Sequence, residues 1–186
     1  MTELSFPLAG RMLVVGPSNV GKTRSTARAL DAWVAEHGPA GVVVFEFAPE
    51  IERDGVLLGG RIARFTTVPD AAWQGVLEAR APRSEGETDA AALALAERNV
   101  AGADRLLEAA PSDPTAVFVN DATVALQADA SRTDRLTGYC DRADVAVLNA
   151  FESDELGVDD PVSRNERDAL DRLRSWADRV VELPSP

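Results

Sequence analysis

One lysine stands in a segment whose residue types and spacing could bind phosphate. Lys22 is the only lysine among the 19 basic residues, and it belongs to segment 16–23, Gly-Pro-Ser-Asn-Val-Gly-Lys-Thr. The segment has the pattern G-x-x-x-x-G-K-[ST], in which two glycines let backbone N–H groups surround a phosphate. The lysine then reaches the outer phosphates, and the hydroxyl that follows binds Mg²⁺. The pattern predicts a triphosphate site with Thr23 as a metal ligand.

The predicted binding set covers the whole segment and the basic residue after it. A helix that begins here would direct its positive end and its free N–H groups at the anion. We expect the ligand to contact Gly16, Pro17, Ser18, Asn19, Val20, Gly21, Lys22, Thr23 and Arg24. The arginines that could stabilise charge on a transferring phosphoryl group are Arg24, Arg53, Arg61 and Arg64, and a surface salt bridge is the favoured alternative for each of them.

The elements on either side of the segment fit this chemistry. Residues 11–15 form an apolar run that predicts a buried strand, and residues 22–36 have the helical spacing of a following helix that ends before Gly38-Pro39. A second apolar run at 42–47 predicts another strand. Strand, loop, helix and strand within this length predict a βαβ unit with parallel strands.

The rest of the chain continues the alternation of strands and helices. Further strands are predicted at 115–119, 145–148 and 180–183, and helices at 69–80, 88–110, 131–142 and 161–177, with a small hairpin or excursion within 48–68. We therefore expect a three-layer α/β fold, a mainly parallel five-stranded sheet with helices on both faces, built as one domain with an insert at about 48–114. The expected strand order is 42–47, 115–119, 11–15, 145–148, 180–183, which places the strand before the loop in the middle.

The motif and the sheet pattern resemble the P-loop NTPase superfamily. The motif covers eight residues, and the alternating pattern extends the resemblance over most of the chain. The resemblance implies an acidic residue at the end of an apolar strand that holds the metal directly or through water. Asp121 fits best, because the strand ends of a parallel sheet are where ligands bind. Glu46, at the end of the second strand, is the rival, and a turn cap is the structural alternative for Asp121.

The general base is left open by the sequence. Many ATPases of the superfamily carry a glutamate directly after this aspartate, whereas Ala122 follows Asp121 here. Acidic residues after the second strand, where related kinases often place a residue that meets the acceptor, are Glu46, Glu50 and Glu52. We take Lys22, Asp121 and Glu46 as the candidate catalytic residues. A solvated role, or pairing with nearby arginines, is the alternative for these acids.

Asn149 is a candidate for contact with the base. In GTP-binding members an asparagine that ends this strand reads guanine, with an acid three residues later, and Asn149 and Glu152 have that spacing. Ala150 replaces the usual lysine between them, so ATP is favoured over GTP, and a turn cap is the alternative role. A weaker resemblance, to cobinamide kinase and guanylyltransferase enzymes, rests on Arg61-Ile62, Trp73 and the stretch from Asn149 to Gly157. The chain lacks the central histidine of that family, because its one histidine is His37.

Composition excludes several other classes. A net charge of −12 opposes general nucleic-acid binding, which needs clustered lysine and arginine. Neither a secretory signal nor a membrane span is predicted, and Cys140 is the only cysteine, so we expect a cytoplasmic location with no membrane partner. The expected function is Mg²⁺-dependent binding of ATP or GTP with hydrolysis or phosphoryl transfer. The alternative is a nucleotide-gated module that turns over slowly and is read by a protein partner; neither acceptor, partner nor oligomeric state is predicted.

Overall fold

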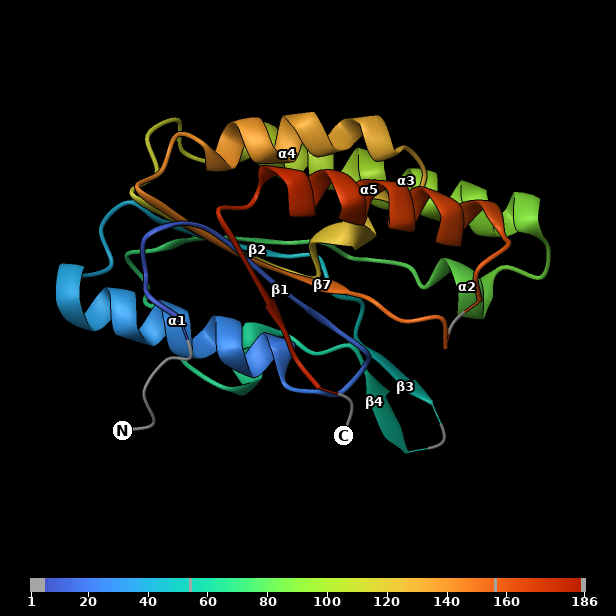
Figure 1. The fold of residues 1–186 in the computed structure, drawn as a ribbon, viewed down its shortest axis with the longest axis horizontal. Coiled ribbons are helices and arrows are strands. Elements are labelled where there is room, and N and C mark those ends of the chain that lie inside the picture. The colour runs from blue at the N-terminus through green and yellow to red at the C-terminus, as the bar shows by residue number, and fades with distance from the viewer. Residues whose placement is uncertain (1–5, 54, 156, 185–186) are drawn as a thin grey trace.

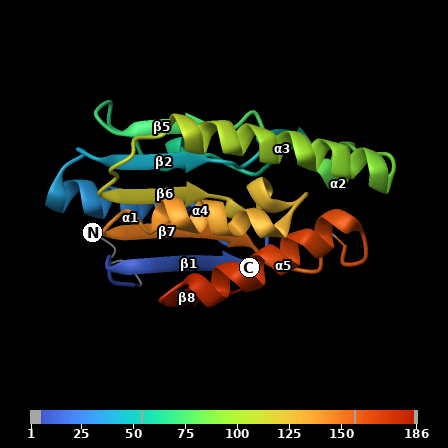
Figure 2. The same cartoon turned by 90° about the horizontal axis from the view of Figure 1, so that it is seen from above.

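The computed structural model describes residues 6–53, 55–155 and 157–184. Its centre is a six-stranded parallel sheet in the order β5-β2-β6-β7-β1-β8. The strands are β1 (Gly10–Gly16), β2 (Val42–Glu46), β5 (Trp73–Val76), β6 (Ala116–Asn120), β7 (Val145–Phe151) and β8 (Arg179–Glu182). Figure 2 shows them side by side and pointing the same way. The predicted α/β class with a parallel sheet is confirmed.

Helices cover both faces of the sheet and make three layers (Figure 1). The helix α1 (Lys22–His37) lies against one face, and α3 (Asp89–Ala109), α4 (Thr133–Cys140) and α5 (Pro161–Trp176) lie against the other. A one-turn helix, α2 (Pro82–Glu85), precedes α3. Three short 3₁₀ helices complete the described helical elements: η1 (Ile62–Arg64), η2 (Ala122–Leu126) and η3 (Ala130–Arg132). Among the described residues, no helix combines the length and the apolarity needed to cross a bilayer.

The predicted strand order is wrong in the middle of the sheet. β7 pairs with both β1 and β6, so it separates the strand that precedes the loop from the strand that ends at Asn120. The strand β1 is consequently second from the edge rather than central. The central strands are buried on both faces and have no polar side to mark a neighbour, so their sequence patterns do not specify their order.

The sheet also has one strand more than predicted. Residues 73–76, which the sequence assigns to a helix, form β5 at the edge of the sheet, where they pair with β2. The ring of Trp73 packs edge-on against Phe45 with centroids 5.4 Å apart, so packing outweighs the weak helical pattern. The predicted excursion is confirmed as an antiparallel hairpin of β3 (Ile51–Arg53) and β4 (Val56–Leu58).

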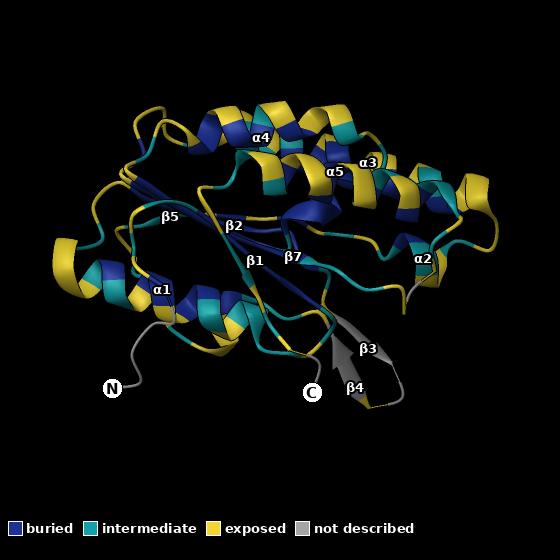
Figure 3. Ribbon diagram, in the orientation of Figure 1, coloured by how far each residue is buried: buried dark blue, intermediate teal, exposed yellow. Residues whose placement is uncertain are grey.

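Two apolar cores lie on the two faces of the sheet, because successive strand side chains point in opposite directions. On the α1 side, Met12 and Val14 pack with Leu30; on the other side, Leu13 and Val15 pack under α5. Figure 3 shows the strands buried and the outer helix faces exposed. A rigid buried sheet therefore fixes the strand ends, and the loops that follow them, in space.

Candidate functional site

The segment 16–23 joins the end of β1 to the start of α1, as predicted. Gly16 has φ +153°, and a Cβ there would lie 2.9 Å from the carbonyl oxygen of Leu183. Gly21 has φ +96° and Asn19 has φ +62°, in the left-handed region that glycine and asparagine tolerate. Only glycine combines the backbone of residue 16 with this close approach. The two motif glycines thus shape the turn.

The first turn of α1 has no side-chain cap. Gly21 is the N-cap residue, and the first turn contains no acidic residue. By contrast, α3 is capped by Thr88 and α5 by Asp160, whose carboxylate accepts a 2.9 Å hydrogen bond from Ser163 N. An uncapped helix start leaves N–H groups without intrahelical partners. Those N–H groups can donate hydrogen bonds to an anion.

Lys22 lies in the opening of this turn. Its ammonium donates a hydrogen bond to the carbonyl of Pro17 and lies 5.9 Å from the ring centre of Phe151. Burial lowers the pKa of Lys22, and the nearby carboxylates of Asp121 and Glu155 oppose that shift. Glu155 also accepts a 3.0 Å hydrogen bond from the backbone N–H of Ser18. A carboxylate thus already contacts one loop amide.

A cavity of about 410 Å³ opens over this loop. Ligand pockets in proteins have about this size. Five basic residues line it, Lys22, Arg24, Arg64, Arg80 and Arg83, against two acidic residues, Asp121 and Glu166. The chain as a whole carries a net charge of −12. The cavity is therefore a positive region in an acidic protein.

Thr23 contacts Asn120, the residue before the predicted metal ligand. Its hydroxyl donates a 3.1 Å hydrogen bond to Asn120 Oδ1, and Asn120 Nδ2 donates to Glu46 Oε2 at 2.9 Å and to the carbonyl of Gly60 at 2.7 Å. We expected Asp121 beside Thr23, and the observed hydrogen-bond partner is its neighbour. Because the Thr23 hydroxyl uses its proton on Asn120, its oxygen lone pairs remain available for a cation.

Glu46 is a buried hydrogen-bond acceptor. Its Oε1 accepts a 2.7 Å bond from Ile62 N, and its Oε2 accepts the bond from Asn120. Burial raises the pKa of Glu46, and these hydrogen bonds act against the shift. Glu46 does not line the cavity. It fixes the segment after Gly60 to the sheet, a structural role that differs from the solvated role and the arginine pairing considered from the sequence.

Asp121 lies in the cavity with one oxygen unpartnered. Its φ of +59° turns the chain at the end of β6, and its Oδ1 is buried without a hydrogen-bond partner among the described residues. Burial raises its pKa to about 6, with the negative charge of Glu166 adding to the shift and Lys22 and Arg83 opposing it. A strained, under-satisfied carboxylate in a cavity is typical of a functional residue.

Asn149 is buried near the carboxyl end of the central strand β7. Its Nδ2 donates to Thr26 Oγ1 at 2.8 Å and to Asn120 Oδ1 at 3.0 Å, while its Oδ1 accepts from Asp121 N at 2.9 Å. These bonds use both amide protons, so a base could hydrogen-bond to the amide only by displacing one of them. The observed contacts join the end of β7 to α1 and to the end of β6, and none of them is to the turn after Asn149, so they are not the turn cap considered from the sequence.

A buried ion pair on the α5 side of the cavity was not predicted from the sequence. Arg83 of α2 pairs with Glu166 of α5, and their side chains are 17% and 7% exposed. Glu166 also accepts hydrogen bonds from Thr123 Oγ1 at 2.8 Å and Gln127 Nε2 at 3.2 Å. Because Nε2 faces the carboxylate, Gln127 Oε1 is left without a partner among the described residues. No motif marks these residues, because they meet only in the folded chain.

The four predicted arginines separate in the structure. Arg24 and Arg64 line the cavity, with the Arg24 guanidinium 5.3 Å from the ring centre of Phe65. Arg61 lies outside the cavity lining and pairs with Glu50 at 3.5 Å. The side chains of Arg53 and Glu52 lie outside the described part of the structure. Two predicted arginines are thus joined at the cavity by Arg80 and Arg83, which the sequence did not indicate.

The comparisons with known proteins do not assign this chain to a family. No family matches it, and no curated protein matches it in sequence. In the described part of the chain, no group of three or more histidine, cysteine, aspartate or glutamate side chains is placed to hold a metal. Mg²⁺ bound to a nucleotide needs only one or two protein ligands, since phosphates and water supply the rest. Thr23 and Asp121 fit that requirement.

Proposed function

We propose that this protein binds a Mg²⁺–nucleoside triphosphate on the segment 16–23 and transfers the γ-phosphoryl group to water or to a small acceptor. The observation that carries the proposal is an uncapped helix start, reached through a turn shaped by Gly16 and Gly21, that opens into a cavity with five basic residues. Backbone N–H groups and a helix start of this kind favour phosphate. The single lysine of the chain lies among them.

Each residue of the site has a task in this proposal. The loop amides and Lys22 would hold the β- and γ-phosphates, and the Thr23 oxygen and Asp121 would hold Mg²⁺, which neutralises charge on the phosphates. Arg83 would stabilise negative charge that develops during transfer, because it is mostly buried and its planar guanidinium is held by Glu166. ATP is preferred over GTP in the proposal, because the Asn149 amide protons are already donated to Thr26 and Asn120.

A nucleotide-gated switch is the second candidate. Ala122 follows Asp121, so the position that often supplies a glutamate base is apolar, and Glu46 is fully engaged in hydrogen bonds. Slow turnover would follow from the lack of a base. A nucleotide that displaced Glu155 from Ser18 N would also release the segment around 152–155, which a partner could read.

A thermal-shift screen with ATP, GTP, ADP and adenosine, each with Mg²⁺, tests the common part of both candidates. A ligand at 100 times its Kd adds about 2.7 kcal/mol to the free energy of unfolding, enough to raise Tm visibly. We expect ATP and ADP to raise Tm and adenosine to have no effect. Steady phosphate release then favours the enzyme, tight binding without release favours the switch, and no shift with any nucleotide contradicts both.

A further inference from the structure

The cavity extends beyond the loop to a cluster of Arg24, Arg64 and Phe65. Of these three, only Arg24 is among the proposed nucleotide contacts. Phe65 is 43% exposed, one of the few large apolar side chains exposed among the described residues. The planar guanidinium of Arg24 lies over its ring, and both residues line the cavity with Arg64. Neither arginine has an ion-pair partner within the described ranges.

This cluster is held in place by the buried core beneath it. Ile62, two residues before Arg64, is fully buried, and its N–H is bound to Glu46 at 2.7 Å. Thr66, one residue after Phe65, donates a hydrogen bond to Asp31 of α1. The segment is therefore anchored on both sides of the exposed pair, and the Phe65 ring lies beside Arg24 in the first turn of α1. An aromatic ring and two cations that line one cavity could bind a flat anionic molecule.

We propose that Arg24, Arg64 and Phe65 form a second subsite, which binds a phosphate monoester that carries a planar ring, a nucleoside monophosphate. The arginines would bind its phosphate and Phe65 would stack on its base. This inference rests on the proposed function, because the monophosphate would be the acceptor for the triphosphate held on the segment 16–23. It names the acceptor class that the sequence left open.

The chemistry of this acceptor matches the site's missing base. A phosphate monoester has its second pKa near 6, so its oxygens are ionised at neutral pH. In the transfer, the bond between the γ-phosphorus and the β–γ bridging oxygen breaks, and a bond forms between that phosphorus and an acceptor phosphate oxygen. The bridging oxygen stays with the leaving nucleoside diphosphate, the acceptor becomes a second nucleoside diphosphate, and no proton has to be removed. A glutamate after Asp121 is then unnecessary.

Calorimetric titration tests the subsite in two steps. The protein is first titrated with Mg²⁺ and ADP, and the ADP-saturated protein is then titrated with AMP, GMP, CMP, UMP and ribose 5-phosphate. We expect at least one nucleoside monophosphate to bind the loaded protein, and ribose 5-phosphate to bind at least tenfold more weakly, because it lacks the ring. If ADP itself does not bind, the proposed function fails; if ADP binds and no monophosphate does, this inference alone fails.

Variants locate the binding. Arg64→Gln and Phe65→Leu should each weaken the monophosphate at least fivefold, whereas Arg28→Gln, exposed one turn further along α1 and outside the cavity, should change its Kd less than twofold. Circular dichroism checks that each variant is folded. Equal binding by the two cavity variants and Arg28→Gln would place the ligand elsewhere. A loss of ATP affinity in Phe65→Leu without a loss of tripolyphosphate affinity would assign the ring to the triphosphate's own base, which also overturns the inference.

Discussion

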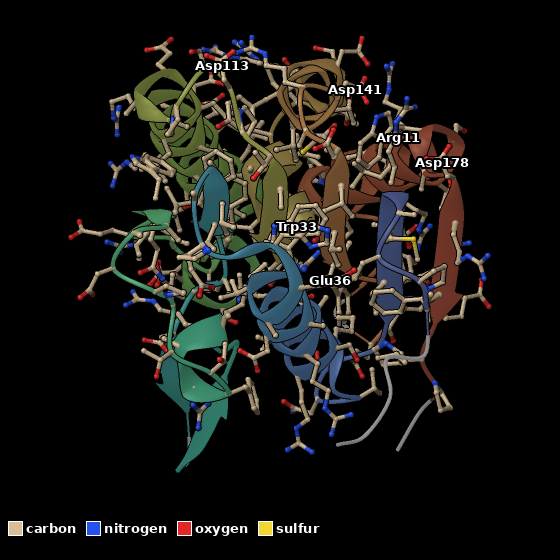
Figure 4. The ribbon with its side chains drawn as sticks, turned by 90° about the vertical axis from the view of Figure 1, so that its left-hand side faces the viewer. Arg11, Trp33, Glu36, Asp113, Asp141 and Asp178 are labelled. Atoms are coloured by element: carbon tan, nitrogen blue, oxygen red, sulfur yellow. The ribbon has the colours of Figure 1, made fainter. Side chains whose placement is uncertain are left out.

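The two ends of the strands in the six-stranded sheet, amino and carboxyl, differ in how the charged groups around them are partnered. At the end of the sheet where the strands begin, the Arg11 guanidinium pairs with Asp141 at 3.0 Å, and the backbone N–H of Arg11 donates to Asp178 at 2.9 Å. Figure 4 views this end of the sheet and labels these three residues near one another. The indole of Trp176 donates to the same Asp141 carboxylate at 2.9 Å. These groups satisfy one another without a ligand.

At the opposite end of the sheet, where the strands end, several polar groups lack hydrogen-bond partners among the described residues. Asp121 and Gln127 each have a buried oxygen without a partner among the described residues, and the first turn of α1 has no side-chain cap. Unsatisfied buried polar groups cost free energy. Trp33 Nε1 and Arg61 Nε, away from the cavity, also lack a hydrogen-bond partner among the described residues, but Asp121 is the one carboxylate among these buried unpartnered groups. The predictions below test the difference between the two ends of the sheet.

The largest effect is expected from breaking the buried ion pair. Glu166→Ala leaves the mostly buried Arg83 without its carboxylate partner and removes the acceptor of Thr123 and Gln127, so we expect a loss of about 3 kcal/mol in the free energy of unfolding. The matched change at the other end of the sheet, Asp141→Ala, removes a pair whose side chains are 43% and 41% exposed and should cost about 0–1 kcal/mol. Urea unfolding measures both. Equal losses would remove the distinction between the two ends.

A stabilising effect is expected from Asp121→Asn. The folded protein raises the pKa of Asp121 from 3.8 to about 6, so the native state disfavours the charged form. Its contribution to stability is therefore fully present below pH 4 and is lost as the pH rises through 6. Asparagine cannot ionise, so at pH 8 the variant should be more stable than the parent by about 3 kcal/mol.

Urea unfolding at pH 4.5 and pH 8 measures this effect. The difference between Asp121→Asn and the parent should be larger at pH 8 and small at pH 4.5. A variant that is less stable than the parent at pH 8 would show that the carboxylate of Asp121 stabilises the fold. That result would contradict the account of Asp121 as a buried group that lacks a partner.

A smaller effect is expected on nucleotide affinity from Glu155→Gln. The Glu155 carboxylate accepts from Ser18 N and would repel a phosphate that bound the same amide. Removing its charge should strengthen ATP binding about fivefold, or about 1 kcal/mol. Asp154→Asn, a neutralisation next to it that affects an exposed pair with Arg167, is the matched control and should change the Kd less than twofold. Weaker binding in Glu155→Gln would mean that Glu155 assists the ligand.

Local sequence patterns predicted most helices and strands and the loop at 16–23. They did not predict which strands pair or which distant side chains meet. The turn at 16–23 and the capped helix after Thr88 follow from residue types within a few positions of each other. The strand order and β5 depend on which fully apolar strands pair, which the sequence pattern does not encode. The same reason hid Arg83 and Glu166, which lie 83 positions apart and meet through α2 and α5.

The measurement that tests the central claim most directly is ATP binding by the two variants Lys22→Ala and Lys22→Arg. Lys22 is half-buried at a helix start, so Lys22→Ala should alter the free energy of unfolding little. Calorimetry with Mg²⁺ and ATP should show a loss of at least 100-fold in affinity for Lys22→Ala, because a phosphate in a partly desolvated site loses its nearest cation.

Lys22→Arg decides between charge and shape. It keeps the positive charge, yet a planar guanidinium does not fit a loop that closes around a phosphate, so we expect it to lose affinity nearly as severely as Lys22→Ala. Unfolding curves that match the parent will show that the loss is local. If Lys22→Arg binds and turns over ATP as well as the parent does, the segment 16–23 does not hold a phosphate, and the proposed function is contradicted.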